Sequence, residues 1–196
     1  GELQVVQKVG YPQMNQSHFT SRNIFSYGVR EFIENGDGRG WLGRFADTYC
    51  ADPGEPLGVV SVGMGRVLDL ESREGESLAL DSVSGFDLLP DYNFRTDHDL
   101  RVRVARRILE REQEPEGGAA LEVFGTGRQA HTLVERVKAG VVGWEDPGDY
   151  PTTTIGRRLK VVSEPLQGYS AFGTKIFYTG MGGFDTHADQ AGRHAD

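Results

Sequence analysis

The hydrophobic positions along the chain change their spacing several times, as expected of a protein that alternates strands with helices. Short apolar runs at residues 3–9, 57–62, 77–83 and 175–178 predict strands. Apolar residues at helical spacing predict helices that begin near residues 19 and 41, and helices over about 97–113, 121–137 and 152–166. The run at 175–178 alternates poorly, which is typical of a strand buried on both faces of a parallel sheet. The pattern predicts an α/β protein.

Composition is consistent with this class. The chain has 196 residues, enough for one domain, and 37% hydrophobic residues with 27 glycines favour a loop-rich α/β protein over a helical bundle. The net charge of −8, from 21 basic and 29 acidic residues, disfavours a general nucleic-acid or anionic-membrane surface. The arginines at 101–107 are separated by apolar positions, and we interpret them as the solvated side of a helix.

The sequence lacks the features of disulfide-linked, membrane-spanning and signal-peptide segments. Cys50 is the single cysteine, which excludes an internal disulfide and a thiolate metal cage. No run approaches the roughly 20 apolar residues of a membrane-spanning helix, and no signal-peptide pattern opens the chain. The chain begins in a predicted strand without Met and ends just after a ligand-rich motif. We therefore expect it to be an excerpt of a longer protein.

The first candidate site lies at the C-terminus. Asp185 and His187 follow the predicted strand at 175–178, with His194 or Asp189 as a further candidate ligand. In open parallel sheets, ligands gather at the carboxyl ends of the strands, and carboxylate with imidazole can hold a divalent cation. The same residues also fit a solvated chain end.

The second candidate site is Ser17-His18, which follows a predicted strand and loop and precedes a helix. A serine hydroxyl at a helix N-terminus lies where the helix dipole favours negative charge, so it is a candidate nucleophile. His18 is a supporting candidate, although neighbouring helical side chains point in different directions. The alternative is that Ser17 only caps its helix.

Three separated stretches together resemble the bacterial "domain of unknown function 1501" family. The matching residues are Val6, Val9, Gly10, Tyr11, Pro12, Asn15, Ser17, His18, Phe19 and Ser21, then Gly40 to Arg44, then Gly182 to His187 and Gln190. The resemblance covers almost the whole chain, and its middle, about 67–147, matches only loosely.

The resemblance implies a branch of the alkaline-phosphatase and sulfatase superfamily. The implied fold is a three-layer α/β/α sandwich with a mostly parallel sheet, here incomplete, in one domain over 1–196 with a variable, partly helical cap-like insertion at about 67–147. The implied function is metal-dependent hydrolysis of phosphate or sulfate esters, small or polymeric, by Ser17 as nucleophile. Asp185, His187 and His194 would then hold zinc, calcium or magnesium.

The chain also departs from this family. The Gly-Gly-Asn-Asp, Ser-Glu-Phe-Gly-Arg and Asp-His-Gly motifs of similar proteins are missing from the 196 residues. We therefore expect weak metal binding and little turnover from this chain alone. Family members commonly carry a twin-arginine signal, which implies the cell envelope or periplasm. The alternative functions are a non-catalytic envelope protein that uses the same fold for binding or assembly, and a truncated, inactive product.

Overall fold

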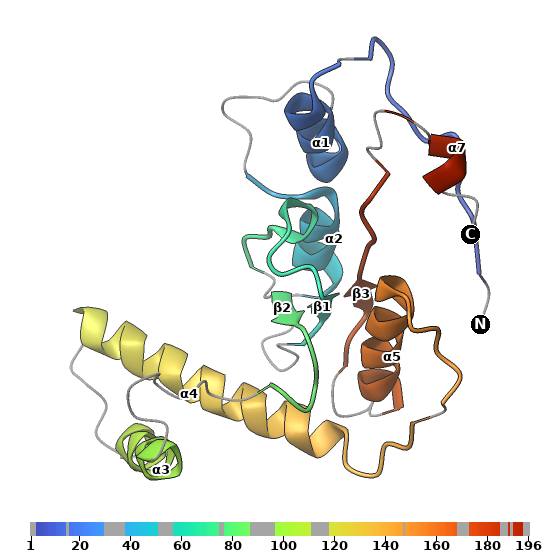
Figure 1. Ribbon diagram of the computed structural model, residues 1–196. Coiled ribbons are helices and arrows are strands. Elements are labelled where there is room, and N and C mark those ends of the chain that lie inside the picture. Colours follow the sequence, from blue (N-terminus) through green and yellow to red (C-terminus); the bar gives the residue numbers. More distant parts are fainter. Residues whose placement is uncertain are drawn as a thin grey trace.

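A small parallel sheet with helices packed against it forms the centre of the molecule (Figure 1). The computed structural model describes residues 3–14, 16–29, 38–50, 57–74, 77–86, 97–110, 118–146, 148–167, 173–184, 188 and 190–193. Its strands are β1 (Val59–Val62), β2 (Ser77–Leu80) and β3 (Ile176–Tyr178). Its helices are α1 (His18–Tyr27), α2 (Trp41–Tyr49), the 3-10 turn η1 (Leu68–Leu70), α3 (His98–Leu109), α4 (Gly118–Gly140), α5 (Thr154–Gln167) and α7 (Gln190–Arg193).

Strand β1 lies in the middle of the sheet, in the order β2-β1-β3. Both pairings are parallel, with Val59 opposite Ser77 on one side and opposite Ile176 on the other. Parallel neighbours require crossover connections, and the connection from β2 to β3 contains α3, α4 and α5. All three strands therefore end at the same edge of the sheet.

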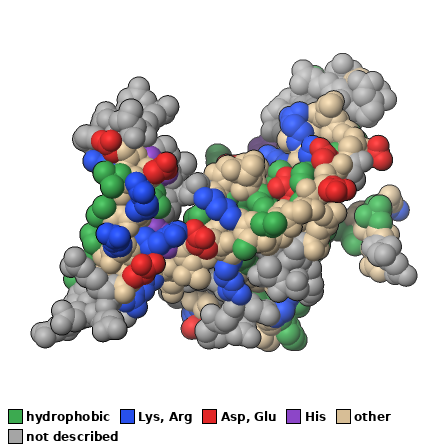
Figure 2. Space-filling view, turned by 90° about the horizontal axis from the view of Figure 1, so that it is seen from below, with side chains coloured by type: hydrophobic (Ala, Val, Ile, Leu, Met, Phe, Trp, Pro, Cys, Tyr) green, Lys and Arg blue, Asp and Glu red, His purple; other side chains and the backbone are tan. Residues whose placement is uncertain are grey.

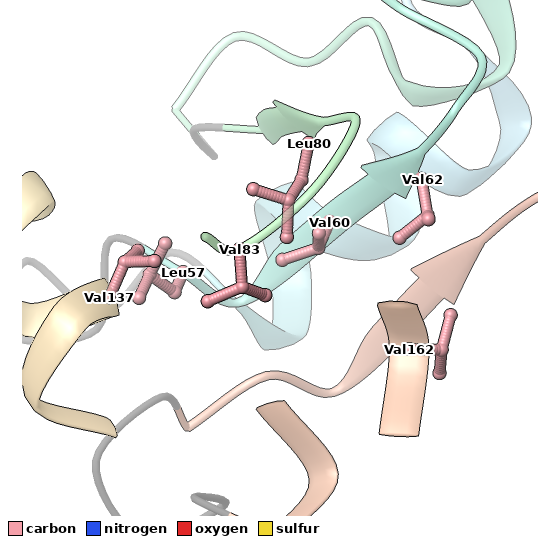
Figure 3. Close-up of a cluster of buried hydrophobic side chains, with 7 residues drawn as sticks. All are labelled: Leu57, Val60, Val62, Leu80, Val83, Val137 and Val162. Carbon is pink, nitrogen blue, oxygen red and sulfur yellow. The ribbon is translucent and has the colours of Figure 1, made fainter. Parts of the chain in front are cut away.

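One face of the sheet packs against α4 and α5 (Figure 3). Val60 and Val62 of β1 point to this face, where Val137 of α4 and Val162 of α5 meet them in one buried cluster. The cluster also contains Leu57, Leu80 and Val83. Val137 is fully buried, so the C-terminal end of α4 belongs to the core of the protein.

The other face packs against α2 and η1. Val59, Ala46, Cys50 and Leu70 form a second buried cluster there. The contact is close, because a Cβ at Gly43 of α2 would lie 1.8 Å from a backbone carbonyl oxygen just after η1. Buried clusters on both faces confirm an α/β protein with a parallel sheet. The more specific three-layer, alkaline-phosphatase-like arrangement stays a prediction.

Helices α3 and α4 form a hairpin that extends away from the sheet (Figure 1). Arg128 of α4 donates from Nε to the carbonyl oxygen of Leu109 in α3 at 2.5 Å, and Arg106 pairs with Glu135 at 2.6 Å. The lobe at the left of Figure 2 carries basic side chains beside hydrophobic ones, and α3 contributes arginines there. The cap-like role proposed for 67–147 stays a prediction, although β2 within this range is part of the sheet.

Several local predictions were wrong. Residues 3–9 form no strand in the described segment 3–14, and Leu3 and Val6 are 92% and 78% exposed. A strand needs a partner for its backbone groups, and apolar residues alone do not supply one. In the helix predicted over about 152–166, the apolar spacing predicts a buried Leu159, which is exposed, and Pro165 is expected to end the helix but lies inside α5. Strand β3 was predicted to be buried on both faces of the sheet, and its three residues are half-buried.

The predicted helices and the other three strands agree closely with the observed elements. Cys50 is buried at the C-terminal end of α2, where it is part of the core. Within the described parts of the chain, no helix is both long and apolar enough to cross a lipid bilayer.

Candidate functional site

Ser17 is the N-cap of α1, as the sequence predicts. Its backbone is extended, with φ −77° and ψ 118°, and its Oγ accepts a hydrogen bond from the backbone N–H of Thr20 at 3.4 Å. This bond is longer than the usual N–H···O distance of about 2.9–3.0 Å. Ser17 is half-buried and His18 is exposed. The capping role is therefore present, and the hydroxyl still lies at the start of a ten-residue helix.

The loop before α1 is held against the helix. The Tyr11 hydroxyl lies 2.6 Å from Oγ of Ser21, and the Tyr11 ring packs edge-on against Phe25 with 5.8 Å between centroids. Both partners are on α1. The segment that leads to Ser17 is thus positioned by its own helix.

Asp185, His187, Asp189 and His194 lie outside the described residues. Within the described part of the chain, no three His, Cys, Asp or Glu side chains lie close enough together to hold a metal ion. The chain that leads to the candidate ligands is described as far as residue 184, and it runs from β3 through Thr179 and Gly180.

Asp69 of η1 connects α1, α2 and β3. Its carboxylate accepts from Oγ of Ser26 at 3.0 Å and from Nε1 of Trp41 at 3.3 Å. The phenol of Tyr178 lies close enough to Asp69 for this carboxylate to raise its pKa. Burial is the main cause of the raised pKa of Tyr178, the interaction with Asp69 raises the pKa further, and the charge of Arg22 opposes the shift. The helix that begins at Ser17 is therefore tied to the strand that leads to Asp185.

The carboxyl ends of all three strands meet around one turn, Gly63-Met64. The N–H of Gly63 donates to the carbonyl oxygen of Leu80, at the end of β2, at 2.9 Å. The hydroxyl of Thr179, just after β3, donates to the carbonyl oxygen of Val62 at 3.0 Å. Arg158 of α5 reaches the same place and donates to the carbonyl oxygen of Gly180. This edge is where parallel sheets commonly bind ligands.

A cavity of about 400 Å³ opens beside β1 and β2. Its lining includes Ser61, Ser77, Leu70 and an ion pair between Arg66 and Glu71, whose two hydrogen bonds measure 2.6 and 2.7 Å. The hydrogen bonds from Arg66 lower the pKa of Glu71. The buried Ser61 hydroxyl donates to a backbone carbonyl at 2.8 Å. Arg66, Glu71 and Ser61 in the lining therefore already have hydrogen-bond partners within the protein.

Sequence reasoning missed Asp69, Tyr178 and Arg158. Asp69 lies in a short turn with no recognisable motif, and Arg158 has the helical spacing of a solvated residue. Only the folded chain brings these side chains to the strand ends. For Arg158 one signal was available, because a glycine pair, Gly63 and Gly65, follows β1 and indicates a close approach there.

Comparison of the chain with protein-family models, with curated proteins and with solved structures found no match. The resemblance described above therefore stays a prediction.

Proposed function

We propose that this protein is a metal-dependent hydrolase-like protein that acts on phosphate or sulfate esters, with Ser17 as nucleophile and Asp185, His187 and His194 as metal ligands. The proposal includes the relationship to the family that the sequence resembles and its three-layer fold. The observation that carries it is the connection of α1 to β3 through Asp69, because it makes the helix of the candidate nucleophile a neighbour of the strand that precedes the candidate ligands.

The distances that the chain must span are compatible with one shared site. Ser17 precedes Ser26 by nine residues of helix, or about 14 Å at about 1.5 Å per residue. Asp185 follows Tyr178 by seven residues, and an extended chain of that length covers up to about 23 Å. In Figure 1 the chain that leaves β3 runs toward the end of the molecule where α1 lies. The ligand segment is therefore long enough to reach Ser17.

The donor set favours zinc among the divalent cations. Asp185 offers carboxylate oxygen, and His187 and His194 offer imidazole nitrogen. Zinc is commonly bound by such mixed sets, whereas calcium and magnesium prefer oxygen ligands throughout. When bound, the ion would act as a Lewis acid at the ester oxygens and lower the pKa of the serine hydroxyl.

The role of Ser17 follows from its chemistry. Its Oγ would form a bond to phosphorus or sulfur while the bond to the leaving oxygen breaks, and the hydroxyl proton would pass to a base. Water would then release the product and restore the hydroxyl. The N-terminus of α1 favours the serine alkoxide electrostatically.

The test measures zinc binding by calorimetry together with turnover of phosphomonoester, phosphodiester and sulfate ester substrates on the full-length protein, because we expect weak metal binding and little turnover from these 196 residues alone. We expect stoichiometric zinc binding that weakens at least about 10-fold in Asp185→Ala and His187→Ala, and turnover that is lost in Ser17→Ala. His131→Ala, a histidine of α4, is the matched control and should behave like the wild type. Zinc affinity that is indifferent to both ligand substitutions would refute the metal site, and activity that survives Ser17→Ala would refute the nucleophile.

A further inference from the structure

Arg158 occupies an unusual place for a long basic side chain. It lies in the first half of α5, and its guanidinium crosses to the carboxyl edge of the sheet, between the ends of β1 and β3. Nη1 donates to the carbonyl oxygen of Gly180 and lies 3.0 Å from Sδ of Met64. Arg158 thus contacts the exits of two neighbouring strands.

The backbone around the guanidinium leaves room for it. Gly63 has φ +65°, and a Cβ at this position would lie 2.5 Å from Nε of Arg158 and 3.0 Å from its Cδ. Any other residue at 63 would push the side chain away from the strand ends, and it would also be strained at that φ. Gly63 and Arg158 therefore form one structural unit at this edge.

The guanidinium keeps unused donors and an uncompensated charge among the described residues. Both contacts use Nη1, and an arginine has five N–H groups, so those of Nη2 and Nε remain. Four ion pairs are formed within the described part of the chain, and Arg158 takes part in none of them. In a protein with net charge −8, such a cation at the ligand-binding edge of a parallel sheet needs an explanation.

We propose that Arg158 binds the non-bridging oxygens of a tetrahedral oxyanion, the phosphate or sulfate group of the ester substrate. The inference rests on the proposed function and adds to it the residue that recognises the anionic group. A guanidinium fits such a group because its planar fork can donate two parallel hydrogen bonds to two oxygens. Gly180, which accepts from Arg158, precedes Asp185 by five positions in the chain, so Arg158 contacts the strand exit that leads to the candidate metal ligands.

The experiment measures binding of inorganic phosphate and inorganic sulfate by calorimetry, in buffer with a chelator so that no metal contributes. We compare the wild type with Arg158→Gln, Arg158→Lys and Arg157→Gln. Arg157 is the matched control because it is the adjacent arginine of α5 and donates to the backbone carbonyl of Thr152, which precedes that helix. Arg157→Gln changes the net charge as Arg158→Gln does.

We expect Arg158→Gln to weaken oxyanion binding by about 10- to 100-fold, the usual value of a hydrogen bond between charged partners. Arg158→Lys keeps the charge without the fork and should lie between Arg158→Gln and the wild type. Arg157→Gln should stay within about twofold of the wild type, and thermal unfolding of each variant confirms that binding is measured on folded protein.

The outcomes separate this inference from the proposed function. Equal affinities in Arg158→Gln and the wild type would overturn the assignment, even if Ser17 proves essential for turnover. Equal losses in Arg157→Gln and Arg158→Gln would overturn it as well, because they would show a general charge effect.

Discussion

Substitutions at Ser17 separate its capping role from its proposed chemical role. The side chain accepts one hydrogen bond, from the N–H of Thr20, and α1 has no acidic residue in its first turn that could replace this interaction. Ser17→Ala removes both the acceptor and the hydroxyl. Ser17→Asn keeps an acceptor and removes the hydroxyl, and Ser17→Gly removes both at a small energetic cost, since glycine is tolerated at N-caps.

The magnitude follows from the length of the bond. N-cap substitutions to alanine cost about 0.5–2 kcal/mol, and the 3.4 Å bond places Ser17→Ala in the lower part of that range, at about 0.5–1 kcal/mol. Ser17→Gly should cost a few tenths of a kcal/mol, and Ser17→Asn should be close to neutral. Domains are stable by about 5–15 kcal/mol, so all three variants remain folded at 25 °C.

Urea unfolding gives the free energy of unfolding for each variant, and ester hydrolysis is measured on the same preparations. If Ser17 is the nucleophile, all three variants lose turnover by about 10³-fold or more, independently of their stability. Turnover that follows stability, with Ser17→Asn nearly as active as the wild type, would refute the nucleophile. A free energy of unfolding that is unchanged in Ser17→Ala would refute the energetic contribution of the cap.

Three further predictions concern the core and pH. Val137→Ala should lower the free energy of unfolding by about 2–3 kcal/mol, because Val137 is fully buried. Urea titration measures this change, and a loss below about 0.5 kcal/mol, as expected of a surface residue, would place α4 outside the core. Gly43→Ala should destabilise the protein by about 3 kcal/mol, because its Cβ would overlap a backbone carbonyl. Gly125→Ala has open space around the new Cβ and should stabilise the protein by about 0.5–1 kcal/mol. Thermal unfolding of both variants distinguishes the two effects. The raised pKa of Tyr178 means that its neutral form stabilises the fold below the ordinary value of 10.0, and this contribution is lost as the pH rises through the folded pKa. Alkaline titration of tyrosine absorbance should show one late phenol that is missing in Tyr178→Phe.

Some residues of the candidate site could be predicted from the sequence, and others could be found only in the folded structure. Ser17 could be predicted as a helix cap because capping depends on a side chain and on backbone groups three residues away. The role of Asp69 could not be predicted, because its partners Ser26 and Trp41 lie 43 and 28 residues away in the chain. The same holds for Arg158 and Met64, which are separated by 94 residues.

The sequence by itself determined the order and type of most elements, because the spacing of apolar residues and the glycine turns act within a few residues of chain. It also determined that β1 is buried, since three of its four residues, Val59, Val60 and Val62, are apolar. Only the tertiary structure decided which strands are neighbours, that residues 3–9 remain unpaired in the described segment, and that Leu159 faces solvent. These outcomes depend on which surfaces meet after the chain has folded back on itself, and pairing between distant segments leaves little trace in local periodicity.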